Sequence, residues 1–218
     1  MTDERVAEIE RRLDDYFGLI APELRNDPIA ELIGTILSQN TSDLNSERAF
    51  VALRERFPSW EAVLAADDAE IVEAIRAGGL AQVKGPRIKQ VLERIAEDRG
   101  EISLDFLTDL PPAAARAYLL SLPGVGVKTA ACVQVFACGQ PALPVDTHVH
   151  RLAIRLGLIE PGTNAERAQA RLEAMVPLER HYSLHVHLIR LGREICKAQR
   201  PRCPECPLLE ICPRVGVA

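Results

Sequence analysis

Four cysteines near the end of the sequence have the residue type and the spacing of a metal site. Six, two and five residues separate them, and prolines punctuate the loops between Cys196, Cys203, Cys206 and Cys212. Four thiolates that converge on one centre bind zinc or an iron–sulfur cluster, and the spacing alone favours zinc by frequency. Cys132 and Cys138 are expected to be buried small apolar residues. His181, His185 and His187 have ligand-like helical spacing, but we interpret them as packing or surface residues.

A second motif, Leu122-Pro123-Gly124-Val125-Gly126, lies between a predicted helix that ends near Ser121 and another that starts near Gly126. Glycine lacks a Cβ, so the backbone can turn sharply and approach a ligand closely. The N–H groups that open the next helix can bind a phosphate oxygen. The motif indicates a helix-hairpin-helix that contacts a DNA backbone without reading its sequence, and an ordinary turn between helices is the alternative.

Lys128 stands in the first turn of the second helix, where the helix macrodipole disfavours a cation. Burial and the dipole would together favour the neutral amine, which is the form that a nucleophile needs, whereas a solvated lysine is the alternative. Asp146, in Val-Asp-Thr-His, is predicted to be the N-cap of a helix that runs to about Gly157. A carboxylate there could also act beside Lys128 if the fold brings the two together.

The elements that must position these residues are helical. Apolar residues recur every three or four positions around residues 6–17, 29–37, 44–57 and 88–95. Asp43 and Asp67 are predicted N-caps, Pro86 and Pro112 suit a first helical turn, and Gly100 indicates a helix end. Because no stretch alternates strictly between apolar and polar residues, we expect an all-α protein of about ten helices.

Composition places the chain among ordinary globular proteins. It has 218 residues, of which 47% are apolar and 26% charged, so long disorder and fibrous repeats are excluded. No signal segment or apolar run of membrane-spanning length is present, which predicts a soluble intracellular protein. The net charge of −5 argues weakly against a nucleic-acid partner. However, residues 61–75 alone hold five acidic and no basic residues, whereas residues 190–218 hold six basic and three acidic ones. We therefore expect residues 61–75 to form an acidic outer helix and residues 190–218 to form a basic edge.

Together, Leu-Pro-Gly-Val-Gly-x-Lys-Thr-Ala, Val-Asp-Thr-His and the four-cysteine spacing resemble endonuclease III, a family of helix-hairpin-helix base-excision DNA glycosylases with a [4Fe–4S] cluster. The resemblance runs from about Ile29 to Cys212. It implies two α-helical domains that flank a cleft. Residues 26–137 would form a six-helix domain with the hairpin, and residues 1–25 plus 138–218 the cluster domain. It also replaces zinc with a [4Fe–4S] cluster as the expected cofactor of the four cysteines.

The resemblance further implies a bifunctional glycosylase and AP lyase that flips oxidised pyrimidines out of the duplex. Lys128 would be its nucleophile, forming a Schiff base that leads to β-elimination, and Asp146 its catalytic carboxylate. The partner would be double-stranded DNA with a damaged base or an abasic site. We expect a monomer in the cytoplasm, associated with the nucleoid of a bacterial or archaeal cell and with no membrane. The implied DNA contacts are Asn40, Leu80, Leu122, Gly124, Gly126, His148, Arg151, Lys197 and Arg200.

Some positions depart from the family pattern. Gln39-Asn40 stands where well-known bacterial members have Ala-Gln, Ala81 replaces an aromatic residue after the wedge Leu80, and Val83 replaces a serine. These departures leave open which oxidised pyrimidine is removed. A mismatch or adenine glycosylase of the same superfamily is the nearest rival function, and Lys128 argues against it. The same motifs would also suit a non-catalytic DNA-binding iron–sulfur protein or a zinc-stapled helical adaptor.

Overall fold

The computed structural model describes residues 2–23 and 27–217. Within those residues it contains helices and no strand, which confirms the all-α prediction. The chain divides into two compact units, which we call the hairpin unit, Leu24–Gln140, and the cysteine unit, Met1–Glu23 with Pro141–Ala218. The predicted junction at residues 25 and 26 lies outside the described residues. The roles assigned to the two predicted domains stay predictions.

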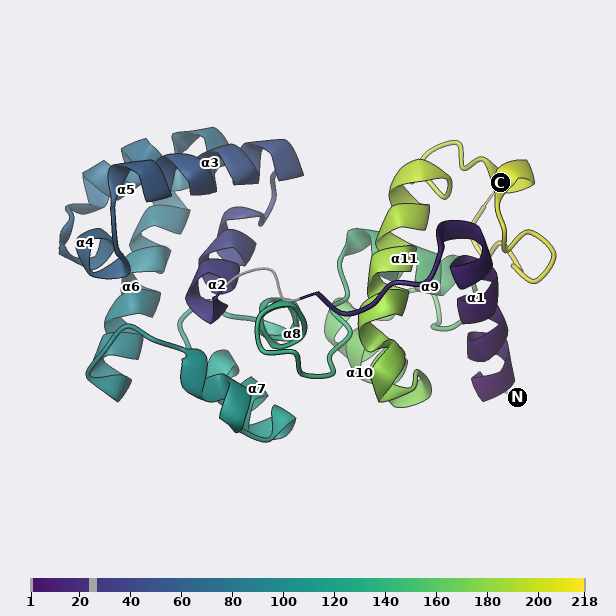
Figure 1. Ribbon diagram of the computed structural model, residues 1–218. Coiled ribbons are helices and arrows are strands. Elements are labelled where there is room, and N and C mark those ends of the chain that lie inside the picture. The colour runs from purple at the N-terminus through teal and green to yellow at the C-terminus, as the bar shows by residue number, and fades with distance from the viewer. Residues whose placement is uncertain (1, 24–26, 218) are drawn as a thin grey trace. The chain divides into compact units, whose positions relative to one another are not determined.

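The hairpin unit is built around α2, which packs against both α3 and α8, while α5 packs along α6 and α7 contacts α8 (Figure 1). Its core is a continuous cluster of buried aliphatic side chains that includes Leu32, Ile36, Leu53, Ile88 and Leu92. Its elements are α2 (Pro28–Leu37), α3 (Asp43–Arg56), α4 (Trp60–Ala65), α5 (Asp68–Ala74), α6 (Ala81–Arg99), α7 (Pro112–Ser121) and α8 (Val127–Phe136), with the short 3-10 helices η1 (Arg76–Gly78) and η2 (Asp105–Asp109).

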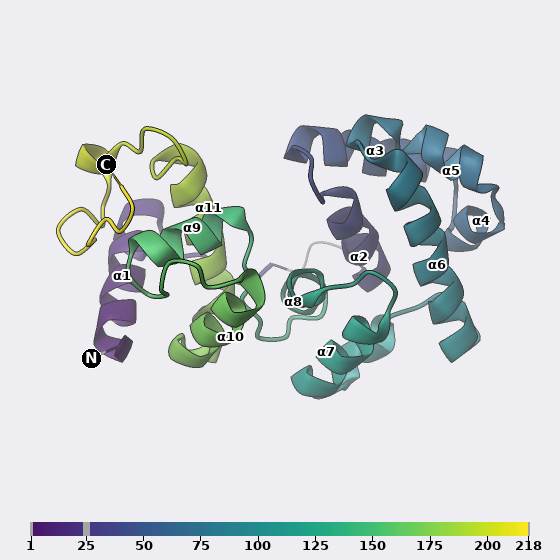
Figure 2. The same cartoon turned by 180° about the vertical axis from the view of Figure 1, so that it is seen from behind.

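The cysteine unit brings the N-terminal helix onto the C-terminal part of the chain. Helix α1 packs against α10 and α11, and α9 lies along α11 (Figure 2). Val6, Ile9 and Leu13 of α1 are buried in the core of this unit, as their helical spacing predicts. The elements are α1 (Thr2–Phe17), α9 (Thr147–Arg155), α10 (Ala165–Met175) and α11 (His181–Glu194), with the 3-10 helices η3 (Leu178–Arg180) and η4 (Cys203–Glu205).

Three of the local predictions are wrong in detail. Ser42, not Asp43, is the N-cap of α3, because its side chain accepts the N–H of Asn45. Leu44, the first residue of the apolar stripe predicted at 44–57, is 56% exposed, since α3 turns the face that carries Ala49 and Leu53 toward the core. Pro86 lies inside α6 rather than in its first turn, because the helix already begins at Ala81.

The other predicted helix starts and ends are confirmed. Asp67 caps α5 in a capping box with Glu70, Pro112 is the first residue of α7, and Gly100 ends α6 in the left-handed conformation. The acidic stretch forms two short helices, α4 and α5, instead of one. Its carboxylates are partly neutralised by ion pairs, which join Arg56 to Glu70, Arg76 to Glu73 and Lys89 to Asp68. In the described residues, no helix is long and apolar enough to cross a membrane.

Candidate functional site

The hairpin forms as predicted between α7 and α8. Helix α7 ends at Ser121, and the Leu122 N–H closes it by donating to the Leu119 carbonyl. The Val125 N–H then donates to the Leu122 carbonyl, which tightens the turn. The side chains of Leu122 and Val125 are buried in the core of the hairpin unit. Leu122 thus anchors the hairpin by packing, and its role as a DNA contact stays a prediction.

The two glycines of the hairpin are exposed and have different roles in the turn. Gly124 has φ +70°, a conformation that favours glycine because it has no Cβ. Gly126 is the N-cap of α8, and a Cβ built on it would meet no atom within 4 Å. The positive end of the α8 macrodipole thus opens beside an exposed, glycine-lined turn, an arrangement that suits an anionic oxygen.

Lys128 is the second residue of α8 and its side chain is half-buried, while the next residues, Thr129 and Ala130, are buried. The helix that carries it is held by a buried amide network. The Gln134 Nε2 donates to the Pro112 carbonyl at 2.8 Å, and the Arg116 guanidinium donates to Gln134 Oε1 at 2.9 Å. Because these bonds fix α8 on α7, they give the Cα atom of Lys128 a defined position beside the hairpin.

Asp146 is the N-cap of α9, as predicted: its Oδ1 accepts the Val149 N–H at 2.8 Å. The residues before it are also held. His185 bonds the Pro144 carbonyl through Nδ1 at 2.8 Å, and Glu173 accepts the Leu143 N–H at 3.1 Å. The carboxylate therefore has one fixed orientation in the cysteine unit. Lys128 belongs to the hairpin unit, so the pairing of the two side chains stays a prediction.

The two segments predicted to enter damaged DNA lie in the hairpin unit. Asn40 follows α2 and Leu80 precedes α6, and both are exposed non-glycine residues with positive φ, 53° and 52°. The Leu80 side chain is 54% exposed and that of Val83 57%. An exposed aliphatic pair beside a turn is suited to contacting the apolar faces of nucleic-acid bases.

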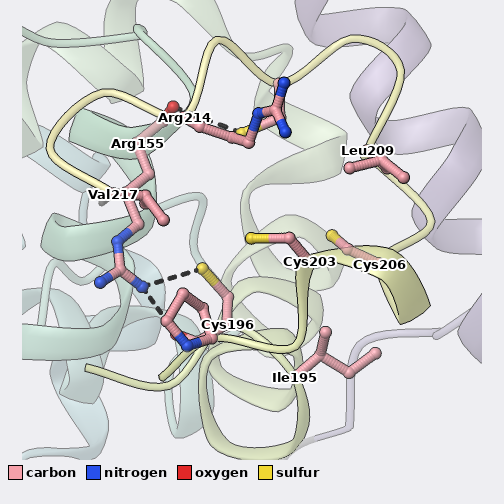
Figure 3. Close-up of a pocket in the computed structure, with 10 residues that line it drawn as sticks. Arg155, Ile195, Cys196, Cys203, Cys206, Leu209, Arg214 and Val217 are labelled. Atoms are coloured by element: carbon pink, nitrogen blue, oxygen red, sulfur yellow. Dashed lines mark hydrogen bonds between the residues drawn. The ribbon is translucent and has the colours of Figure 1, made fainter. Parts of the chain in front are cut away.

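The four C-terminal cysteines line one cavity in the cysteine unit, together with Arg155, Pro201 and Leu209 (Figure 3). All four are free thiols that form no disulfide. Arg155 Nη1 lies 3.2 Å from the Cys196 Sγ and 2.7 Å from the Lys197 carbonyl, to which it donates. Burial raises the pKa of the Cys206 thiol to about 11 and also raises that of Cys212.

This cavity fits a thiolate-bound cluster. Four thiols face the same space, and a cation bound there would counter the burial that otherwise keeps Cys206 and Cys212 protonated. No group of three or more His, Cys, Asp or Glu side chains among the described residues is arranged to hold one metal ion. Four cysteines are the ligand set of a [4Fe–4S] cluster, which takes one cysteine per iron, and also of a structural zinc site.

The three histidines of α11 and the two cysteines of the hairpin unit have packing positions. His181 and His187 each bond a main-chain carbonyl through Nε2, those of Val176 and Gly18, and His185 bonds that of Pro144. All three histidines are buried. Cys132 and Cys138 are buried in the hairpin unit, as predicted for small apolar residues.

The predicted DNA contacts of the cysteine unit differ in exposure. Lys197 and Arg200 are exposed on the loop between Cys196 and Cys203, and Arg200 has φ 51°. The Arg151 guanidinium instead donates to the carbonyls of Gly192 and Cys196, each at 3.0 Å, and burial lowers its pKa. His148, which lies 3.2 Å from Arg151 Nη2, is half-buried. DNA contact by these residues stays a prediction.

Three basic residues with defined positions were not singled out by the sequence motifs. Lys84 is buried with its amine on two main-chain carbonyls, Arg87 lies over Gly124, and Arg155 lies at the cysteine cavity. A basic residue on an amphipathic helix is usually solvated, so its type alone gives no sign of burial. Lys84 stands four positions before buried Ile88, in line with the apolar stripe of α6, and this register is the signal that could have identified it.

Comparisons with known proteins identify a family and several relatives of this chain. Residues 33–178 match the model of the HhH-GPD superfamily of base excision DNA repair proteins. Endonuclease III of Thermotoga maritima is 36% identical over 186 residues, which are 85% of this chain and 83% of that protein. The DNA glycosylase/AP lyase ROS1 of Arabidopsis thaliana is 34% identical over 170 residues, 70% of this chain but 12% of ROS1. The chain spans less than two thirds of the plant relatives that it matches.

A solved structure has the same fold over nearly the whole chain. It is a trapped covalent intermediate of endonuclease III with DNA, and it superposes with a TM-score of 0.84 at 30% identity. The match covers 98% of this chain and 97% of that one.

Proposed function

The chain belongs to the HhH-GPD superfamily of base excision DNA repair proteins, and from this premise we propose that it is a bifunctional DNA glycosylase and AP lyase for oxidised pyrimidines. Its relatives at about this level of identity carry the names endonuclease III and DNA glycosylase/AP lyase. The observation that carries the proposal is Lys128, a half-buried primary amine on the first turn of α8, directly after the glycine hairpin.

The chemistry begins with extrusion of the damaged nucleotide, because its sugar carbon cannot be reached inside the duplex. The Lys128 amine attacks C1′, the bond from C1′ to the base breaks, and the base leaves with the electron pair of that bond. Loss of the amine proton and opening of the sugar ring give an iminium between Lys128 and C1′. Removal of a C2′ proton then expels the 3′ phosphate by β-elimination, and water releases the enzyme from the remaining aldehyde.

Asp146 is the proposed catalytic carboxylate of this reaction. Negative charge beside the sugar would stabilise the positive charge that grows on it as the base departs, and the same oxygens can accept the proton of the attacking amine. Its role as N-cap of α9 is compatible with this, because the bond from Val149 N–H uses Oδ1 and fixes the plane of the carboxylate. Capping thus orders the group before DNA arrives.

The hairpin and the cysteine loop would each contact the DNA backbone. The open N-terminus of α8 suits a phosphate oxygen, and exposed Lys197 and Arg200 provide cations on the loop that follows Cys196. Cys196, Cys203, Cys206 and Cys212 would hold the [4Fe–4S] cluster. When bound, the cluster cross-links the loop that carries these cations.

A product assay tests this function. The full chain is incubated with a duplex that contains one thymine glycol, with a matched undamaged duplex as control, and the products are identified by mass. We expect release of the base together with a strand that ends in an unsaturated aldehyde, the product of β-elimination. Release of the base with an intact abasic strand would remove the lyase activity from the proposal, and no release from any oxidised pyrimidine would contradict the substrate class.

A further inference from the structure

Two neighbouring segments of the hairpin unit end in exposed tips with positive φ, and at Leu80 this conformation is strained. Asn40 and Leu80 have φ values of 53° and 52°, in the left-handed region where a residue with a Cβ is disfavoured. Leu80 has no polar side chain that could compensate through a local hydrogen bond, and more than half of its side chain is exposed. Such a conformation persists only where the surrounding structure holds it.

The two segments lie close to each other. A Cβ built on Gly78 would come within 2.9 Å of the Ala49 Cβ and 4.0 Å of the Leu37 carbonyl oxygen. A Cβ on Gly79 would lie 4.0 Å from the Thr41 Oγ1. Residues on both sides of Asn40 therefore lie near those that lead into Leu80.

Lys84 joins the two segments. Its side chain is only 3% exposed, and its Nζ donates to the Leu37 carbonyl at 2.7 Å and to the Gly78 carbonyl at 2.9 Å. Leu37 is the last residue of α2 and Gly78 the last of η1, so both carbonyls are at helix ends, which lack intrahelical partners and attract a cation.

No carboxylate in the described part of the chain explains the burial of this amine. Among the described residues no ion pair involves Lys84, and burial lowers its pKa. A buried amine is unfavourable unless its protons are bonded, and the two carbonyls are the partners that it has. Lys84 itself is too buried to touch DNA.

We propose that Lys84 is a positioning residue: it fixes the tips at Asn40 and Leu80 relative to each other, so that both enter damaged DNA together around the flipped nucleotide. This inference rests on the proposed function. Tips that are held before DNA arrives do not have to be ordered on binding, which favours the distorted complex with damaged DNA. Contact with the backbone of undamaged DNA needs no insertion of the tips. It therefore does not depend on the bonds that Lys84 makes to the two segments.

The test measures two affinities of the full chain by fluorescence anisotropy. One is for a duplex with a central tetrahydrofuran, a stable abasic analogue, and the other is for the same duplex undamaged. For Lys84→Met, which keeps the length but removes the donors, we expect the affinity for the abasic duplex to fall roughly tenfold. We expect the affinity for the undamaged duplex to stay within about twofold of wild type, since backbone contacts set it.

Lys89→Met is the matched control. Lys89 lies on the same helix, and its Nζ also donates to a main-chain carbonyl, that of Ala66 at 2.8 Å, but away from the two tips. Its substitution should leave the ratio of the two affinities unchanged. An equal fall in the ratio for both lysines would show a general loss of stability in α6 and would overturn the proposal.

A double substitution separates positioning from packing. If Lys84 acts in part through the Leu80 tip, Lys84→Met combined with Leu80→Ala should lower the ratio by less than the product of the two single effects. A fall in the ratio that equals the product of the two single effects would overturn the proposal. Should Lys84→Met fail to fold, Lys84→Gln, which is polar but too short to reach both carbonyls, is measured by the same criteria.

The two proposals fail differently. A wild-type chain that binds the abasic and undamaged duplexes equally and releases no damaged base would contradict the proposed function. A wild-type chain that prefers the abasic duplex and releases the base, with the same preference retained in Lys84→Met, would contradict only the role of Lys84.

Discussion

The guanidinium of Arg87 fills the space that a side chain on Gly124 would need. A Cβ built on Gly124 would lie 2.5 Å from the Arg87 Cζ and 2.6 Å from its Cδ. Helix α6 thus places a cation directly on the turn of the hairpin. Because the N-terminus of α8 opens beside the same turn, Gly124 is where the backbone, the cation and an approaching phosphate would come together.

Gly124→Ala should therefore disturb both folding and binding. The added methyl group has to displace Arg87, and φ +70° is strained for alanine. We expect the free energy of unfolding to fall by about 1–3 kcal/mol and the affinity for duplex DNA to fall with it. Gly126→Ser is the control, since that site is open and serine is a good N-cap. Equal stability of the two variants in urea titrations would contradict the expected strain at Gly124.

Substitution of a cavity cysteine should remove the metal. We expect the purified wild-type chain to contain roughly four iron atoms and Cys203→Ser to lose most of them, because each cysteine binds one iron of a [4Fe–4S] cluster. Cys132→Ser, at a buried position of the hairpin unit, should retain the iron content. The measurement is iron and acid-labile sulfide per chain. One zinc and no sulfide in the wild type would favour a zinc staple.

Substitutions of three basic residues in the cysteine unit should have two kinds of effect, one on DNA affinity and the other on stability. Lys197→Ala and Arg200→Ala should each reduce the slope of log affinity against log salt by about 1 and leave stability unchanged, because both side chains are exposed. Arg151→Ala should lower the free energy of unfolding by about 1–3 kcal/mol, because its guanidinium bonds the carbonyls at the end of α11. A reduced salt slope without loss of stability in Arg151→Ala would make it a DNA contact instead.

The buried ring of His187 should make the cysteine unit sensitive to acid. Burial lowers the pKa of His187, which bonds the Gly18 carbonyl and lies 3.5 Å from Asp14 Oδ1. As the pH falls below about 6.5, an unfolded histidine binds a proton that the folded one does not, so the free energy of unfolding decreases. Above that pH this contribution to stability is fully present.

His187→Gln should flatten this decline between pH 6.5 and pH 5, which urea midpoints at several pH values measure. Glu10, whose pKa is raised by burial, contributes the opposite slope in the wild type, since its stabilising effect is lost as the pH rises above about 4.5. The comparison with the variant isolates the histidine, because Glu10 is common to both proteins. An unchanged slope in the variant would show that His187 is not the titrating group.

Helix positions followed from the sequence because the apolar spacing is a local property of the chain. The stripe from Ile29 to Leu37 and that from Ile88 to Ile95 are buried as predicted, and Asp146 caps α9. The error at Leu44 arose because α3 has no strong apolar face, so Ala49 and Leu53 determined its orientation in the fold.

The two hydrogen bonds of Lys84 could not be predicted from apolar spacing. One of its partners is the Leu37 carbonyl, which is 47 residues away in the chain, and main-chain acceptors leave no mark on residue types. Arg155 is similar, because its partners at Cys196, Lys197 and Ala198 are carbonyls and a thiol on a loop 41 to 43 residues later. The register of Lys84 in the apolar stripe of α6 indicates that its side chain is buried, but residue types do not indicate which carbonyls it bonds.

Borohydride trapping tests the central assignment, Lys128 as the nucleophile, most directly. The full chain is incubated with an abasic duplex, borohydride is added to reduce the iminium to a stable amine, and the covalent complex is separated by denaturing electrophoresis. Lys89→Gln, a lysine of the same unit held by Asp68 and the Ala66 carbonyl, is the control. The wild type and Lys89→Gln should be trapped and Lys128→Gln should not, while all three bind the duplex. Equal trapping of Lys128→Gln would contradict the assignment.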